Sequence, residues 1–202
     1  MVSALAVGFV ASFLTARYPM ERSVQETFYG YVLDPAKDAY DFHLIDQNGS
    51  PYCLSQLHGK VVLFSFGYTH CPDVCPTTLS AFSTIYHALP EKERNRVQVL
   101  FISVDPPRDR PEVLKKYIPY FDRSFVGLTG EANQILETAT AYGAAYTTVH
   151  PRGEGPDVYF INHSPFAYVI SPSGKLQLRY LLDQLRDTKK VAADIEKLLA
   201  GT

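Results

Sequence analysis

Cysteine is scarce in this sequence, and its scarcity excludes one class of protein. The 202 residues include only three cysteines, Cys53, Cys71 and Cys75. Three cysteines are too few for the disulfide framework that holds small secreted proteins together. Two of them lie four residues apart, which instead favours a metal or redox pair. We expect Cys53 to be a small buried side chain outside that pair.

Positive charge is not in excess either. The chain carries 19 Lys and Arg residues against 21 Asp and Glu residues, and its formal net charge is −2. Nucleic-acid-binding domains carry clustered basic residues, so we expect no nucleic acid among the partners. Internal repeats and low-complexity tracts are also absent. With 46% apolar and 20% charged residues, the chain has the composition of one soluble globular domain with a short extra segment.

The extra segment is the N-terminus, where residues 2–15 carry no charge. This stretch resembles the apolar part of an export signal or membrane anchor, although a full span needs about 20 residues. A buried helix docked on the domain is the alternative. We predict an anchor or signal at residues 1–18, a tether at 19–38 and the domain at 39–202. The domain would then lie on the exported side of a membrane, and the lack of a long Arg/Ser-rich leader favours the periplasmic face of a bacterial inner membrane.

Strand and helix patterns alternate in the rest of the chain. Residues 61–66, VVLFSF, form a continuous apolar run between two glycines, which is typical of a central strand buried on both faces. Further strands are predicted at 41–46, 97–104, 125–128, 159–161, 166–170 and 176–181, and helices at 79–89, 111–118, 131–142 and 188–199. This order predicts an α/β sheet with helices on both faces. In such sheets the ligand site lies at the carboxyl ends of the strands, where Cys71 and the turn at Asp105 should emerge.

The run CPDVCP places Cys71 and Cys75 four residues apart, so a helical turn brings both sulfurs onto one face. Thiolates are soft ligands that select copper(I) or zinc over hard cations. A helix beginning directly after Cys75 would add amide dipoles that lower the thiol pKa values. The alternative is a plain disulfide or a pair of buried thiols, but Asp73 between them is costly to bury in an inert core.

A third ligand is expected from one of six histidines. We favour His163, because it lies in an Asn-His-Ser loop entering a strand and such a loop can approach the helix that carries the cysteines. The other five are less suitable. His70 would point away from the pair, His87 lies late in a helix, two precede the site and one lies in a Pro/Gly-rich loop; the last three are His43, His58 and His150.

These motifs resemble those of the Sco/SenC family, the copper-handling proteins that help to assemble cytochrome c oxidase. The resemblance covers about residues 30 to 200 and rests on FSFGYTHCPDVCPTTL, FISVDPPRDRPEVLKKY, FVGLTG and INHSPFAYVISPSG, in this order. It implies a thioredoxin-like fold with a central mixed sheet, flanking helices and an extra N-terminal β-hairpin. It also implies a membrane tether and a copper ion held by Cys71, Cys75 and His163.

The resemblance further implies a receiver, the dinuclear copper centre of cytochrome c oxidase subunit II, and exchange with other copper chaperones or thioredoxin-like reductases. Two residues depart from the usual pattern. Asn162 stands where the family commonly has Asp, which removes an anionic partner beside the histidine. Pro165 lies about where thioredoxin enzymes place their cis-proline.

Two functions follow from these residues. The first is a copper metallochaperone, which needs no turnover chemistry. The second is a thiol-disulfide oxidoreductase that reduces the copper-binding cysteines of a partner, with Cys71 and Cys75 as the redox-active pair. The CxxxC spacing favours the first, because redox enzymes of this fold usually carry CxxC. A peroxidase of the same fold is a weaker third hypothesis, since an isolated peroxidatic cysteine is lacking.

Overall fold

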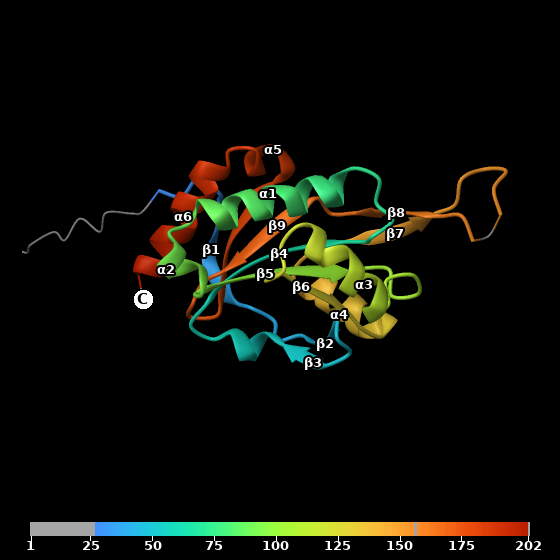
Figure 1. Ribbon diagram of the computed structural model, residues 1–202, viewed down its shortest axis with the longest axis horizontal. Helices are drawn as coiled ribbons and strands as arrows, with labels where there is room; N and C mark the ends of the chain where they lie inside the picture. The colour runs from blue at the N-terminus through green and yellow to red at the C-terminus, as the bar shows by residue number, and fades with distance from the viewer. Residues whose placement is uncertain (1–26, 156, 202) are drawn as a thin grey trace, which may run out of the picture.

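The computed structural model describes residues 27–155 and 157–201. Its main feature is an eight-stranded sheet with the order β1-β10-β9-β4-β5-β6-β2-β3 (Figure 1). The central strands β4 (Val61–Gly67), β5 (Val97–Ser103) and β6 (Val126–Thr129) run parallel, whereas β9 (Phe166–Ile170) runs antiparallel to β4. The sheet is therefore mixed, as predicted.

The remaining elements surround these four strands. The other strands are β1 Tyr31–Asp38, β2 His43–Asp46, β3 Pro51–Cys53, β7 Tyr146–Val149, β8 Phe160–His163 and β10 Lys175–Leu181. The helices are η1 Leu54–Leu57, α1 Val74–Ala88, α2 Glu91–Arg94, α3 Pro111–Tyr117, η2 Ile118–Tyr120, α4 Ala132–Ala141, α5 Leu182–Leu185 and α6 Thr188–Ala200.

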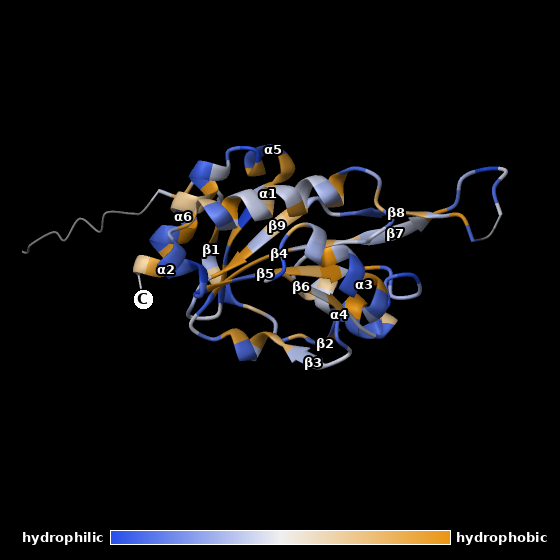
Figure 2. Cartoon of the chain, in the orientation of Figure 1, coloured by the Kyte–Doolittle hydropathy of each residue, from blue (hydrophilic) through white to orange (hydrophobic). Residues whose placement is uncertain are grey.

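The hydrophobic core lies between the central sheet and the helices that pack on it. Every residue of β4 is buried, which explains why its sequence is apolar except for Ser65 instead of alternating. Helices α1 and α6 pack against each other, and both contact β4. Figure 2 shows orange, apolar central strands and surrounding helices that carry blue and white segments beside the orange ones. Phe64 stacks on Tyr168 with ring centroids 5.0 Å apart, so aromatic packing joins β4 to β9.

The expected N-terminal hairpin is formed by β2 and β3, which pair antiparallel and join the main sheet where Ile45 pairs with Thr129. The predicted tether at 19–38 is wrong for its last part, because residues 31–38 form β1 and pair with β10 at the sheet edge. β1 carries Pro35 and is exposed along almost its whole length, so its sequence has no buried period to reveal a strand. The anchor predicted at residues 1–18 lies outside the described residues, and in the part described no helix is long and apolar enough to cross a membrane.

Strands β7 and β8 form a separate two-stranded sheet that projects beyond the main body (Figure 1). The sequence predicted a strand at 159–161 followed by a loop containing His163. Instead, His163 is the last residue of β8 and pairs with Tyr146 of β7. The histidine therefore reaches the body of the protein from a short hairpin and not from a loop.

Candidate metal centre

The two cysteines lie in the connection between β4 and α1. Cys71 belongs to the loop, while Cys75 is the second residue of α1, which begins at Val74 after the N-cap residue Asp73. The helix thus begins one residue before Cys75, not after it as predicted. Gly67 ends β4 directly beneath the pair, and a Cβ at this position would lie 2.7 Å from the Cys75 sulfur. A glycine is required there because the thiol occupies that space.

His163 meets the cysteines from β8, 88 residues further along the chain than Cys75. Its Nε2 lies 3.4 Å from the Cys75 sulfur, and the ligand atoms of Cys71, Cys75 and His163 all lie within 4.8 Å of one another. The His163 Nδ1–H donates to the carbonyl of Ser164 at 3.1 Å. This bond fixes the tautomer in which Nε2 carries the free lone pair that a metal needs.

Hydrogen bonding between the two cysteines shifts their pKa values in opposite directions. The hydrogen bond from Cys75 is the main cause that lowers the pKa of Cys71 to about 5, with further lowering by the backbone N–H groups of Asp73 and Cys75, against the opposing effect of burial. Interaction with the Cys71 thiolate and burial raise the pKa of Cys75. At neutral pH the reduced pair is therefore one half-exposed thiolate and one buried thiol.

We predict that Cys71 alone is alkylated rapidly by iodoacetamide in the Cys53→Ser variant. Because thiolate is the reactive form and the folded pKa lies below the ordinary value, the rate should rise through a midpoint near pH 5 and stay high above it. Mass spectrometry of quenched samples measures the rate at each pH. A midpoint near the ordinary thiol value of about 8.5 would contradict the geometry of the pair.

A buried carboxylate supports the loop that carries Cys71. Asp109, which is fully buried, accepts hydrogen bonds from the Thr69 N–H at 2.9 Å, the Thr69 hydroxyl at 2.6 Å and the Ser103 hydroxyl at 2.6 Å. Burial raises the pKa of Asp109, while these three hydrogen bonds lower it. The predicted convergence of the Cys71 loop and the Asp105 turn at the carboxyl ends of β4 and β5 is thus observed.

Sequence reasoning gave Asp109, Thr69 and Tyr159 no role. The run VDPPRD, with two prolines and three charged residues directly after a buried strand, was the available signal. A charged residue beside a buried strand end is expensive unless it has partners, so such a residue points to a polar network.

His70 adjoins Cys71, with its Nδ1 3.9 Å from the Asp109 carboxylate, whereas His43, His87 and Cys53 lie away from this centre. His43 is opposite Cys53 in the β2–β3 pair, and Cys53 is half-buried with its sulfur 3.2 Å from the Ser55 hydroxyl. His87 contacts Asp122 at 2.8 Å at the far end of α1. In residues 27–155 and 157–201, one group of three His, Cys, Asp or Glu side chains is close enough to share an ion, and it consists of Cys71, Cys75 and His163.

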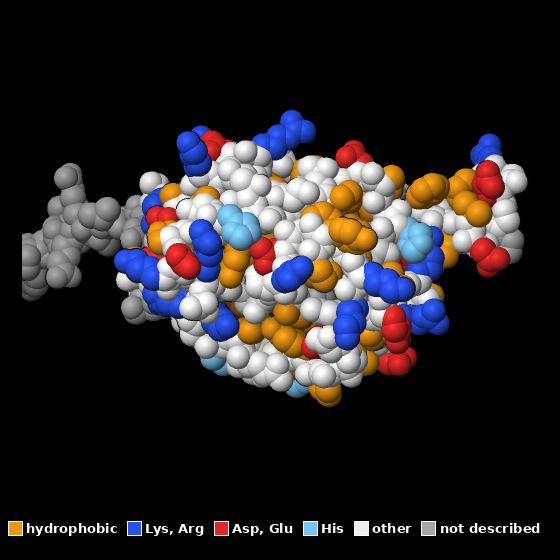
Figure 3. Space-filling model, in the orientation of Figure 1, with side chains coloured by type: hydrophobic (Ala, Val, Ile, Leu, Met, Phe, Trp, Pro, Cys, Tyr) orange, Lys and Arg blue, Asp and Glu red, His pale blue; other side chains and the backbone are white. Residues whose placement is uncertain are grey.

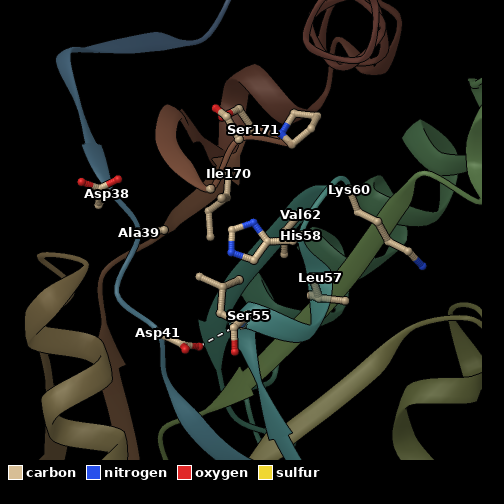
Figure 4. Close-up of a pocket in the computed structure, with 14 residues that line it drawn as sticks. Asp38, Ala39, Asp41, Ser55, Leu57, His58, Lys60, Val62, Ile170 and Ser171 are labelled. Atoms are coloured by element: carbon tan, nitrogen blue, oxygen red, sulfur yellow. Dashed lines mark hydrogen bonds between the residues drawn. The ribbon is translucent and has the colours of Figure 1, made fainter. Parts of the chain in front are cut away.

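His58 lines a cavity of about 170 Å³ at the opposite end of β4 (Figure 4). Val62 and Ile170 contribute to its apolar floor, while Asp41 at its rim accepts a hydrogen bond from the Ser55 N–H. Since Val62 lies near the start of β4 and the cysteines follow its end, this cavity is not part of the metal centre.

Comparison with known proteins agrees with this geometry. The model of the SCO1/SenC family matches residues 33–200, most of the chain. This chain belongs to the SCO1/SenC family. A SCO2-like protein of Rickettsia conorii is 39% identical to this SCO1/SenC chain over 150 residues, which are 74% of this chain and 72% of the relative.

Solved structures give the same result. The SCO1/SenC chain is similar to apo Sco1 of Thermus thermophilus, with a TM-score of 0.77, 43% identity and coverage of 87% of this chain and 99% of that one. It is also similar to ScoI of Bradyrhizobium japonicum, solved with copper bound, with a TM-score of 0.72, 34% identity and coverage of 80% and 99%. The predicted thioredoxin-like fold is confirmed.

Two further features of this SCO1/SenC chain bear on its chemistry. Among the described residues only the bond between Asp34 and Pro35 is cis, so the bond before Pro165 is trans.

A groove of about 470 Å³ opens beside Cys71, and Pro72, Phe160 and Pro165 help to line it. Apolar side chains, among them Val149 and Phe160, are exposed on the projecting hairpin next to it (Figure 3). The candidate metal centre therefore faces an accessible, partly apolar surface.

Proposed function

We propose that this protein is a copper metallochaperone that carries its ion on Cys71, Cys75 and His163. The observation that carries the proposal is the convergence of two thiol sulfurs and one imidazole nitrogen within 4.8 Å. Soft sulfur donors with one imidazole fit copper(I), and hard cations such as magnesium or calcium prefer oxygen. Copper is the cargo, so the chemistry required is capture and release.

Three ligands and an open side suit release. Structural metal sites are closed by four protein ligands, whereas this centre offers three, and both Cys71 and His163 are only half-buried. A partner's sulfur or nitrogen can therefore approach the ion through the groove beside Cys71. Stepwise ligand exchange through a shared intermediate then needs no opening of the core.

The receiver that we propose is the dinuclear copper centre of cytochrome c oxidase subunit II. The family resemblance supports this choice, as does the soft character of the three ligands, which allows transfer to another cysteine- and histidine-containing centre. We further propose that residues 1–18 anchor the domain on the exported side of a membrane, where such a receiver domain lies.

Thiol-disulfide oxidoreduction is the second candidate, favoured by the low pKa of about 5 of Cys71 beside the buried Cys75 thiol. In that reaction the Cys71 thiolate attacks a partner disulfide and releases one partner thiolate. Cys75 then attacks the mixed disulfide, which releases the second partner thiolate and leaves this pair oxidised. This role gives His163 no necessary part.

A transfer experiment separates the two functions. The described domain, reduced and loaded with one equivalent of copper(I), is mixed with the reduced, copper-free soluble domain of an oxidase subunit II, and copper is measured on each protein after separation. We expect net transfer of copper from the wild type to the receiver domain. When a chelator is added to the mixture, it should remove copper from His163→Ala before transfer. Insulin reduction measured on the same samples should be slow. Fast turnover independent of His163, without transfer, would replace the chaperone function by the oxidoreductase.

A further inference from the structure

We infer that Arg108, together with Tyr159, is a positioning residue that holds His163 at the cysteine pair. The inference rests on the proposed copper function, because it assigns a role within the same centre. Arg108 touches none of the three ligand atoms at hydrogen-bond distance; it acts through the segment that leads into β8.

Arg108 and Tyr159 are joined by several contacts. The Arg108 guanidinium pairs through Nε with the buried Asp105 and donates from Nη1 to the Tyr159 carbonyl at 3.0 Å. The same guanidinium lies over the Tyr159 ring, 3.6 Å from its centroid. The Tyr159 hydroxyl donates to the Asp105 carboxylate at 2.8 Å. Residues 105–109 form a turn, which we call the 105–109 turn. It holds Tyr159 through the backbone carbonyl, the ring and the hydroxyl.

The 105–109 turn reaches both halves of the metal centre. Asp109 at its end holds Thr69, two residues before Cys71. Arg108 holds Tyr159, directly before the strand that ends in His163. Arg108 also lies 5.7 Å from the centroid of Tyr68, whose ring meets His163 edge-on with centroids 6.1 Å apart. One turn therefore fixes the distance between the thiol loop and the histidine strand.

This connection matters because β8 is not part of the main sheet. It pairs only with β7 in the separate two-stranded sheet, and its residues are mostly exposed or half-buried. The carboxyl end of the hairpin is fixed by β9, which begins three residues after His163. Ile161 anchors the middle of β8 in the core, and at its amino end Tyr159 is held by the contacts with Arg108 and Asp105.

The test is a double-mutant cycle in copper(I) affinity, measured on the purified full-length protein by competition with a chelator. Arg108→Ala should weaken copper(I) binding about tenfold to hundredfold, which is typical for residues that orient a metal ligand. In the His163→Ala background the same change should alter affinity by less than about twofold, because the group that it orients is gone. Arg110→Ala, an exposed arginine on the same segment, is the matched control and should have no effect.

Two more variants separate the effect of position from that of charge and of misfolding. Arg108→Lys keeps the positive charge but lacks the planar guanidinium fork. Its copper(I) affinity should stay well below that of the wild type if position matters, and should equal that of the wild type if charge alone matters. Tyr159→Leu removes the ring and hydroxyl while leaving the buried Arg108–Asp105 pair intact, and it carries the cycle if Arg108→Ala does not fold. The nitrogen coupling in the copper(II) electron paramagnetic resonance spectrum should fall in Arg108→Lys and in Tyr159→Leu.

The outcomes separate this inference from the proposed function. Equal losses in the wild-type and His163→Ala backgrounds, or full rescue by Arg108→Lys, would overturn the positioning role while leaving copper binding in place. Failure of the wild-type protein to bind copper(I) would instead overturn the proposed function. A loss confined to proteins that retain His163 is the result that we expect.

Discussion

Cys75→Ser is expected to abolish tight copper(I) binding. Four-ligand structural zinc sites contribute about 10–16 kcal/mol, or about 2.5–4 kcal/mol for each ligand, so the loss of one thiolate should weaken binding about hundredfold to thousandfold. The effect should exceed that of His163→Ala, because sulfur is the softer donor for copper(I). Competition with a chelator under reducing conditions measures both affinities.

Cys53→Ser is the matched control for this prediction. Cys53 is half-buried in β3 and lies outside the group of three ligand residues, so its replacement should leave copper(I) affinity unchanged. If Cys53→Ser weakened binding as much as Cys75→Ser, the ion would be bound elsewhere. If Cys75→Ser retained tight binding, the two-thiol centre would be wrong.

Asp109→Ala is expected to cost about 3 kcal/mol in the free energy of unfolding of the copper-free domain. The fully buried carboxylate accepts three hydrogen bonds from Thr69 and Ser103, and each donor left unsatisfied costs about 1–3 kcal/mol. The hydroxyls can rotate toward other acceptors, which keeps the total near the lower end of the sum. Urea denaturation followed by circular dichroism measures the change.

Asp38→Ala provides the comparison, since the Asp38 side chain is 86% exposed and forms an ion pair with Lys175 across the sheet edge. Its cost should stay within about 0.5 kcal/mol, as for most surface changes. If Asp109→Ala cost no more than Asp38→Ala, the carboxylate would not support the Cys71 loop in the way that the hydrogen bonds indicate.

Local patterns were sufficient for much of the fold and for finding the three candidate ligand residues that the structure brings together. The buried strand β4 was readable because both its faces are covered, and the spacing of Cys71 and Cys75 fits a helix start. The sequence favoured His163 among six histidines, and the structure places its Nε2 beside the cysteine pair. Its role as a ligand remains a prediction until metal is measured.

Other features depend on long-range contacts that no local pattern records. β1 is an exposed edge strand whose pairing with β10 gives it order, so its residues read as a tether. β7 and β8 are four residues each and pair with each other outside the main sheet, so the sequence did not reveal β7 or the extension of the predicted 159–161 strand to His163. The roles of Asp109 and Arg108 appear only when the chain brings residues 69 and 159 against the 105–109 turn.

X-ray absorption spectroscopy of the copper(I)-loaded domain tests the three-ligand centre most directly. We predict a first shell of two sulfurs and one nitrogen for the wild type, loss of the nitrogen in His163→Ala, and loss of one sulfur in Cys75→Ser. A shell of two sulfurs alone that is identical in the wild type and in His163→Ala would contradict the three-ligand centre.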